Sequence, residues 1–244
     1  MVPGGIRRDP WRSMIIPTQI ITAQALTVTI GATVALATTS LAVSAGEVVA
    51  VTGPSGSGKS TLLGCLSGIR VPTEGSVTVA GQPLSRMAAG ARAKFRREHC
   101  GVIFQDADLL DELDVAANVA LPLVFSGLPR PQALERAREM LDAVGCSALV
   151  SRRPAELSGG EAQRVAVARA FVGTPSIVIA DEPTASLDID NAAVVTELIV
   201  HHGHAAGAAT IIATHDRMVA TTCDREVPLH RHAAERDDVA TAER

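Results

Sequence analysis

The sequence has few aromatic residues and no excess of positive charge. Tyrosine is absent, and aromatic residues as a whole make up 2% of the 244 positions. Proteins that bind single-stranded nucleic acids stack the bases on aromatic side chains, so the platform for such binding is missing. The formal net charge of −4 likewise gives no overall attraction for a polyanion. Both shortages argue against a nucleic acid partner.

Cysteine is also scarce, and its four copies are widely spaced. They are Cys65, Cys100, Cys146 and Cys223, and no C-x-x-C pair occurs among them. This spacing indicates neither a zinc site nor a disulfide framework. Isolated free thiols suit a reducing compartment.

The hydrophobic runs are too short or too often interrupted to span a membrane. The most apolar stretch, residues 26–45, contains threonine and serine and leads into apolar residues 48–51, which favours paired β-strands. Near the N-terminus, Arg7 and Arg8 precede a short apolar stretch, but Pro17 interrupts it. We therefore expect neither a signal peptide nor a transmembrane segment.

The sequence does contain a glycine-rich segment between a predicted strand at residues 47–52 and a predicted helix that begins near residue 61. The segment reads Gly53-Pro54-Ser55-Gly56-Ser57-Gly58-Lys59-Ser60-Thr61. The spacing G-x-x-x-x-G-K-S in this context matches the phosphate-binding P-loop, whose backbone N–H groups wrap the phosphates at a helix N-terminus. A glycine-serine turn with a chance lysine is the competing interpretation, and the flanking strand and helix count against it.

The residue types in this loop fit separate tasks. Lys59 is expected to reach the β- and γ-phosphates of a nucleotide, and Ser60 to give its hydroxyl to Mg²⁺. Thr61 and the loop amides are expected to hold the phosphates nearer the base. The loop alone predicts a nucleotide and a metal ion, and it does not identify a reaction.

A second motif follows a predicted buried strand at residues 176–180. There, Asp181 and Glu182 place two carboxylates at the end of the strand. Asp181 can hold Mg²⁺ through its water shell, and Glu182 can polarise an attacking water molecule. On its own, the sequence Asp-Glu-Pro is equally compatible with a turn.

A third motif, Leu157-Ser158-Gly159-Gly160-Glu161, lies at the start of a helix predicted over residues 159–172. Its hydroxyl group and backbone amides make an anion site. A single chain cannot easily fold this second phosphate cradle onto its own P-loop. Gln105, Asp188 and His215 complete the set in a fixed order along the chain.

Together these elements resemble the ATP-binding subunit of ABC transporters over roughly residues 20–230. The resemblance implies an ATPase with ATP and Mg²⁺ as cofactors, in which two subunits, most simply identical ones, sandwich two ATP molecules head to tail. In that arrangement the γ-phosphate held by one P-loop is clasped by the second subunit's Ser158, Gly159, Gly160 and Glu161. The resemblance also implies a transmembrane permease as partner, and hence a peripheral position at the cytoplasmic face of the cell membrane.

The same resemblance assigns roles to the remaining motif residues. Glu182 is the general base, His215 contacts the γ-phosphate, and Asp181 helps to hold Mg²⁺. Gln105 senses Mg²⁺ and the attacking water while it links the site to a helical lobe. Asp188 crosses the dimer interface to the opposite P-loop.

The order of the elements predicts an α/β fold. Strands that alternate with helices indicate a P-loop NTPase core with a mixed sheet flanked by helices. Residues 20–51 indicate an antiparallel β subdomain, and an apolar helix face over residues 131–144 indicates a small helical subdomain. The expected units are a flexible N-terminal arm at 1–19, an ATP-binding core at 20–98 and 158–231, the helical subdomain at 99–157, and a charged tail at 232–244.

Finer features leave two functions open. Residues 101–105, 109–110 and 118–123 look like the lipoprotein-releasing and macrolide-exporting branch of the family, which implies a pump. The cell-division ABC ATPase is similar and shares residues 104–106, which allows an ATP-dependent switch that acts on a membrane partner without transport. The nature of the membrane partner would separate the two.

One position departs from the family pattern. The family usually places an aromatic residue upstream of the P-loop to stack on adenine, and Ile30 stands at that position. Stacking of a base on an aromatic ring contributes about 1 to 3 kcal/mol. We therefore expect weaker ATP binding and poorer discrimination against GTP.

Overall fold

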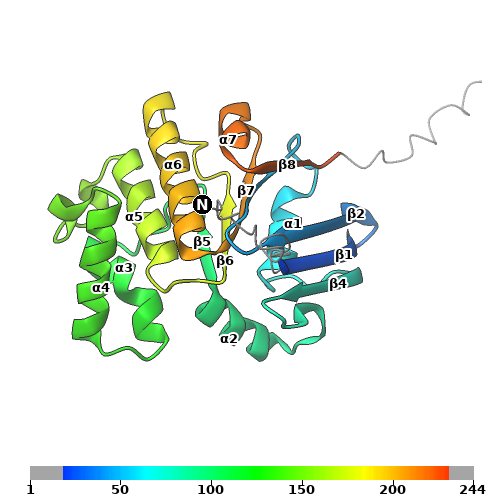
Figure 1. Cartoon of the computed structure of the whole chain (residues 1–244), viewed down its shortest axis with the longest axis horizontal. Helices are drawn as coiled ribbons and strands as arrows, with labels where there is room; N and C mark the ends of the chain where they lie inside the picture. The colour runs from blue at the N-terminus through cyan, green and yellow to red at the C-terminus, as the bar shows by residue number, and fades with distance from the viewer. Residues whose placement is uncertain (1–18, 231–244) are drawn as a thin grey trace, which may run out of the picture.

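The computed structural model describes residues 19–230 (Figure 1). Of the N-terminal arm predicted at 1–19, residues 1–18 lie outside the described residues, whereas Gln19 begins the first strand and is not part of an arm. The predicted tail at 232–244 also lies outside the described residues. Within the described range, no helix has both the length and the apolar character needed to cross a membrane.

Three strands near the N-terminus form an antiparallel sheet in the order β2-β1-β4. β1 (Gln19–Ile30) and β2 (Thr33–Ser44) make a hairpin, and β4 (Glu74–Val79) pairs with the other edge of β1. Buried residues alternate with more exposed ones along β1, as expected for a sheet with one face toward the core. At the hairpin turn Gly31 has a φ of +61°, a conformation that glycine adopts without strain.

A second sheet has five strands in the order β5-β6-β7-β3-β8, and all neighbouring pairs are parallel. Its strands are β3 (Val48–Thr52), β5 (Cys100–Ile103), β6 (Ile177–Asp181), β7 (Ala209–Thr214) and β8 (Arg225–Pro228). β3, β6 and β7 are buried almost throughout, which explains their nearly continuous apolar sequences. Since these three strands are neighbours, the residues that follow them lie at one end of the sheet.

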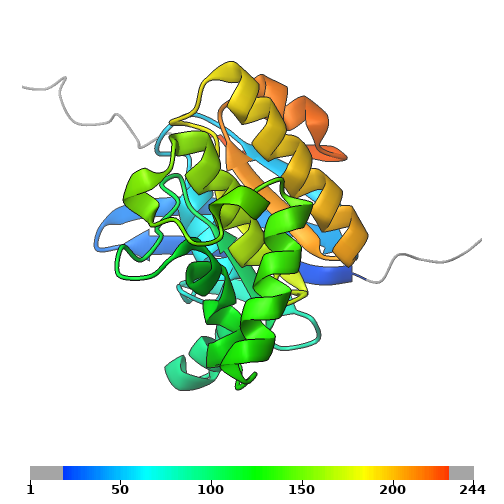
Figure 2. The same cartoon turned by 90° about the vertical axis from the view of Figure 1, so that its left-hand side faces the viewer.

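Helices cover both faces of the parallel sheet (Figures 1 and 2). α1 (Lys59–Leu66) and α2 (Ala89–His99) contribute to the hydrophobic cluster that this sheet shares with the antiparallel sheet. α5 (Gly159–Phe171), α6 (Ile189–Ala206) and α7 (Arg217–Thr222) contribute to a second cluster on the opposite face. A single turn of 3-10 helix over Leu84–Arg86 precedes α2. The parallel sheet is therefore the middle layer.

The segment between β5 and α5 is mainly helical. α3 (Val115–Phe125) and α4 (Arg130–Ala143) pack against each other and against α5. Short 3-10 helices over Ser147–Leu149 and Pro154–Glu156 lead back to α5. β5 itself is hydrogen-bonded into the parallel sheet, so the helical elements begin after residue 103 and not at residue 99.

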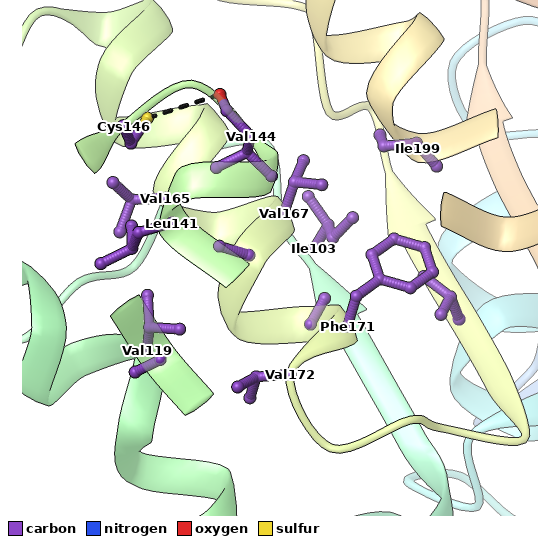
Figure 3. Close-up of a cluster of buried hydrophobic side chains, with 14 of the residues drawn as sticks. Ile103, Val119, Leu141, Val144, Cys146, Val165, Val167, Phe171, Val172 and Ile199 are labelled. Atoms are coloured by element: carbon purple, nitrogen blue, oxygen red, sulfur yellow. Dashed lines mark hydrogen bonds between the residues drawn. The ribbon is translucent and has the colours of Figure 1, made fainter. Parts of the chain in front are cut away.

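The helical segment has no separate hydrophobic core. Figure 3 shows Val119 of α3, Leu141 of α4 and Val165 of α5 in one cluster with Ile103 of β5 and Ile199 of α6. α5 therefore packs on the helical segment with some of its side chains and on the parallel sheet with others.

The predicted α/β fold class, with antiparallel and helical parts attached to a P-loop core, is confirmed. Within the described residues, parallel and antiparallel pairing occur in separate sheets, because β1, β2 and β4 pair among themselves. The core sheet is therefore parallel, whereas the sequence predicts a mixed one, and the antiparallel pairing belongs to a separate sheet.

Asn118 of α3 is a buried polar residue whose side chain makes four hydrogen bonds to the preceding loop. Its Oδ1 accepts from the Leu110 N–H at 2.7 Å. Its Nδ2 donates to the carbonyl oxygens of Leu110, Leu113 and Asp114 at 3.0, 3.3 and 3.1 Å. One side chain thus ties the loop before α3 to the start of the helix, and it pairs the Leu110 N–H and the Leu113 carbonyl oxygen.

We expect Asn118→Ala to lower the free energy of unfolding by about 1 to 3 kcal/mol, because these backbone groups lose their buried partner. Urea denaturation followed by circular dichroism measures the change. Gln132→Ala, which removes an exposed amide from α4, is the matched control and is expected to change stability by about 0.5 kcal/mol or less. Equal losses in the two variants would contradict this role for Asn118.

Candidate functional site

The P-loop connects β3 to α1, and two of its three glycines lie where a side chain cannot fit. Gly58 has a φ of +95°, and a Cβ atom there would lie 2.7 Å from the carbonyl oxygen of Ala35. At Gly53, with a φ of +146°, a Cβ atom would lie 2.4 Å from the carbonyl oxygen of Leu229. The sequence requires glycine at both positions because neighbouring backbone approaches the loop closely.

The N-terminus of α1 is suited to an anion. Gly58 is its N-cap and has no side chain to accept from the first N–H groups, and the first turn carries no acidic residue. The unpaired N–H groups at a helix start and the positive end of the helix dipole together favour a phosphate. Lys59 adds a cation at the first helical position.

A pocket of about 810 Å³ opens over this loop. The sequence-predicted residues that line it are Pro54, Ser55, Gly56, Ser57, Gly58, Lys59, Ser60, Thr61, Gln105, Glu182 and His215. Four lining residues were missed by sequence reasoning, namely Thr33, Val34, Ala35 and Ala185. The first three belong to β2, and no motif marks them, because the packing of the hairpin beside the P-loop is what places them there.

Glu182 is held by two neighbours inside the pocket. Its Oε1 lies 3.3 Å from the Lys59 Nζ, which also donates to the Gly53 carbonyl oxygen at 2.8 Å. Its Oε2 lies 2.9 Å from the His215 Nδ1 and accepts from the His215 N–H at 3.3 Å. The carboxylate is thus oriented by a cation on one oxygen and an imidazole on the other.

The backbone of Glu182 is strained. Its φ of +48° is in the left-handed region, which residues other than glycine, asparagine and aspartate rarely adopt. The Glu182 N–H donates to the Ala213 carbonyl oxygen at 2.9 Å, which helps to hold this conformation. Strain of this kind collects at functional sites, where the surrounding structure fixes a side chain in a required direction.

The residues expected to hold Mg²⁺ fit that ion. Among residues 19–230, Asp181 Oδ1 is buried and has no hydrogen-bond partner, an arrangement that a hydrated cation would satisfy. Ser60 and Gln105 supply further oxygen atoms at the pocket wall. Mg²⁺ prefers such oxygen ligands and binds through one or two carboxylates plus substrate phosphates. Accordingly, the described residues contain no cluster of three acidic, cysteine or histidine side chains that would hold a metal unaided.

Side chains of α5 hold the loop that contains Gln105. Gln163 Nε2 donates to the Phe104 carbonyl oxygen at 2.8 Å. Arg169 donates to the carbonyl oxygens of Ala107 and Asp108 at 2.7 and 2.5 Å. The position of Gln105 at the pocket is therefore tied to the helix that begins at residue 159.

Residues 158–161 lie at the start of α5 and Asp188 at the start of α6, and none of them is among the residues that line the pocket. Ser158 is the N-cap of α5: its Oγ accepts from the Glu161 N–H at 3.3 Å, and the Glu161 carboxylate accepts from the Ser158 N–H at 2.8 Å. The hydrogen bond that the Ser158 N–H donates to the carboxylate, followed by a contribution from the Ser158 side chain, lowers the pKa of Glu161. Asp188 is the N-cap of α6, and hydrogen bonds from Asn191 lower its pKa.

Ile30 is at the end of β1, opposite Thr33 in the hairpin register. Its side chain is 52% exposed and is not among the residues that line the pocket, whereas Thr33 is. A side chain at position 30 is therefore beside the pocket wall, and isoleucine offers no ring to a base.

Comparison with known proteins agrees with this geometry. The ABC transporter family model matches residues 36–185. A dimeric structure of the ATP-binding cassette MJ0796 in a post-hydrolysis state, bound to ADP and Pi, is 32% identical with a TM-score of 0.78, and the match covers 86% of this chain and 94% of that one.

Two further structures are similar to a comparable degree. A second dimeric structure of MJ0796, described as a bacterial ABC transporter cassette, is 33% identical with a TM-score of 0.79 and the same coverage of 86% and 94%. The protein cbiO1 from Clostridium perfringens, part of the ABC transporter complex cbiONQ, is 30% identical with a TM-score of 0.79, and the match covers 87% of this chain and 85% of that one.

A strand, P-loop and helix that face a carboxylate at the end of another strand of the same parallel sheet define the class of P-loop ATPases. Within that class, the matches place the chain in one family. The chain belongs to the ABC transporter family and is an ATP-binding, ATP-hydrolysing domain of it.

We expect Ile30→Tyr to tighten ATP binding, because the ring extends from a position beside Thr33 toward the pocket. A stacking gain of about 1 kcal/mol or more corresponds to a Kd for ATP that is about fivefold lower or better. Equilibrium binding of ATP and GTP to the two proteins measures this gain. Ile30→Leu is the control without a ring, and equal effects of Leu and Tyr would contradict the stacking explanation.

Proposed function

We propose that the chain is the ATP-hydrolysing subunit of an ABC transporter, that two copies close around two ATP molecules, and that this cycle drives a membrane permease. The observation that carries the proposal is the division of the motif residues. The P-loop, Gln105, Glu182 and His215 line one pocket, while residues 158–161 and Asp188 do not. A second copy placed head to tail would bring the second group to the first.

In this proposal Glu182 accepts a proton from water as the water oxygen attacks the γ-phosphorus. The new P–O bond forms as the bond from the γ-phosphorus to the β,γ-bridging oxygen breaks, and ADP and phosphate result. His215 keeps the carboxylate aimed at the water through the 2.9 Å contact. Bound Mg²⁺, held by Ser60, Gln105 and Asp181, would neutralise phosphate charge.

Lys59 is proposed to change partners when the nucleotide binds. In the protein alone, Lys59 Nζ is shared between the Gly53 carbonyl oxygen and Glu182 Oε1. The triphosphate carries more negative charge than one carboxylate and would attract the ammonium group toward the P-loop. Glu182 Oε1 then loses its lysine partner and can accept a hydrogen bond from the attacking water when substrate is present.

The membrane partner is proposed to bind a groove of about 580 Å³ at the junction of α2, β5, α3 and α5. The chain has four phenylalanines, and two of them, Phe104 and Phe125, line this groove with exposures of 40% and 65%. Leu121 and Pro122 extend the apolar surface. Exposure of scarce aromatic residues at one concave site favours a protein partner there, such as an apolar helix face of a permease.

The same groove supports a peripheral location. A domain that binds a permease on the side of the membrane where it also binds ATP would be held at the cytoplasmic face of the cell membrane. In this proposal the helical segment after β5, within residues 104–157, contacts the permease together with α2 and β5, and the described residues outside that segment form the ATP-binding core.

Likeness to the lipoprotein-releasing and macrolide-exporting branch supports a pump, through residues 101–105, 109–110 and 118–123. Likeness of residues 104–106 to the cell-division ATPase supports the second candidate, a switch without transport. Both candidates use the same dimer and the same groove. Co-purification identifies the membrane partner and so separates the two candidates. The partner of a pump requires a substrate cavity among its transmembrane helices, and the partner of a switch does not.

We expect Glu182→Gln to lower ATP hydrolysis by about 100-fold or more, because the amide cannot accept the proton. ATP binding should persist, so the variant should accumulate as an ATP-bound dimer that size-exclusion chromatography with light scattering detects. Glu197→Gln, on the exposed face of α6, is the matched control and should hydrolyse ATP like the unmodified chain. A hydrolysing Glu182→Gln variant, or one that stays monomeric with ATP, would overturn the composite-site proposal.

We expect Phe125→Ser to weaken co-purification with the membrane partner about tenfold or more, since a largely exposed aromatic anchor is lost. ATP binding by the isolated variant checks that it is folded. Val194→Ser removes an exposed apolar side chain from α6, away from the groove, and should leave partner binding intact. Equal partner binding by both variants would rule out the groove as the docking site.

A further inference from the structure

The first turns of α5 and α6 are in direct contact. Figures 1 and 2 show the two helices side by side. Gly160, in the first turn of α5, is buried, and a Cβ atom there would lie 2.3 Å from Asn191 Oδ1 and 3.1 Å from the Asn191 Cβ. Glycine at position 160 therefore lets the Asn191 side chain of α6 pack against the backbone of α5.

Asn191 uses its polar atoms on both helices. Its N–H donates to Asp188 Oδ1 at 2.9 Å, and its Nδ2 donates to Asp188 Oδ2 at 2.7 Å. Its Oδ1 lies 3.4 Å from the Arg164 Nη1 of α5. Both carboxylate oxygens of Asp188 are engaged by this one residue, so the direction of the Asp188 side chain depends on Asn191.

The two elements that Asn191 joins belong together in the proposed dimer. Residues 158–161 and Asp188 are the parts that would reach the ATP held by the second subunit, and neither lines the pocket of its own chain. A catalytic arrangement loses up to about 100-fold in rate when a group is displaced by about 1 Å. A side chain that fixes these two helix starts relative to each other therefore has a direct effect on the composite site.

We propose that Asn191 is a positioning residue that holds the Ser158–Glu161 turn and Asp188 as one preformed surface for the ATP of a second copy of this chain. The inference rests on the proposed dimer. The side-chain hydrogen bonds of Asn191 go to Asp188 and Arg164, and neither of these residues lines the pocket of its own chain. Loss of Asn191 should therefore affect the joint site and spare nucleotide binding by the single chain.

The test uses Asn191→Asp and Asn191→Ala. The aspartate keeps the shape and the acceptor for Arg164, but it replaces the Nδ2 donor by an oxygen that faces the Asp188 carboxylate. The alanine keeps the backbone N–H bond to Asp188 Oδ1 but removes the side-chain bonds to Asp188 and Arg164 without adding charge, and it serves as a second variant should the aspartate fold poorly. Asp190→Asn is the matched control, because it alters one charge in the same exposed turn. Thermal unfolding checks that each variant is folded at the assay temperature.

For Asn191→Asp we expect kcat to fall about 10- to 100-fold while the KM for ATP changes less than about twofold. In the Glu182→Gln background, ATP should bind the monomer with an unchanged Kd, and the ATP-dependent dimer should weaken about tenfold. Asn191→Ala should show a smaller loss of the same kind, and Asp190→Asn should resemble the parent. A merely structural defect would instead lower binding and turnover together.

A double-mutant cycle adds an independent reading. If Asn191 acts by directing Asp188, Asn191→Asp should weaken the ATP-dependent dimer little in a chain that already carries Asp188→Asn. In that chain the carboxylate at position 191 no longer faces a second carboxylate at position 188. Fully additive losses would overturn the inference, as would normal dimerisation and kcat in Asn191→Asp. If Glu182→Gln with Asn191 intact forms no ATP-dependent dimer, the proposed function itself fails, and the inference fails with it.

Discussion

The site depends on the parallel register of three neighbouring strands. Thr52 of β3 is paired with Thr214 of β7, and Asp181 of β6 is paired with Ala213 of β7. The three strands therefore end at nearly the same height at one edge of the sheet. The P-loop, Glu182 and His215 come within hydrogen-bonding reach of one another without long connecting loops, as is usual at the carboxyl ends of strands in such sheets.

Sequence reasoning found the parts of the site that local chemistry determines. The P-loop is recognisable because the glycines, the lysine and the flanking elements all lie within one short stretch. Glu182 and Gln105 are recognisable because each closely follows an apolar run and because both fall in a fixed order of motifs along the chain. Their meeting in one pocket follows from those strands being in the same sheet.

Other features depend on packing that a single sequence does not encode locally. Thr33, Val34 and Ala35 are ordinary strand residues, and they line the pocket because the hairpin folds beside Gly58. β8 is a short edge strand with mostly exposed residues, so it lacks the apolar alternation that predicts strands. No sequence motif marks Asn191 either, and its contacts with α5 become visible only when α5 and α6 are packed together. The missed residues are those whose surroundings come from distant parts of the chain.

The hydrophobic cluster that runs from α3 and α4 through α5 to β5 bears on how the chain folds. Residues 104–157 are inserted between a strand and a helix of the core, yet Val119 and Leu141 share a cluster with Phe171 and Val178. Helix α5 cannot bury its side chains fully until both the inserted segment and the sheet are present. The segment and the core should therefore acquire hydrogen-exchange protection as one cooperative unit, and excision of the segment would leave an apolar helix face open to aggregation.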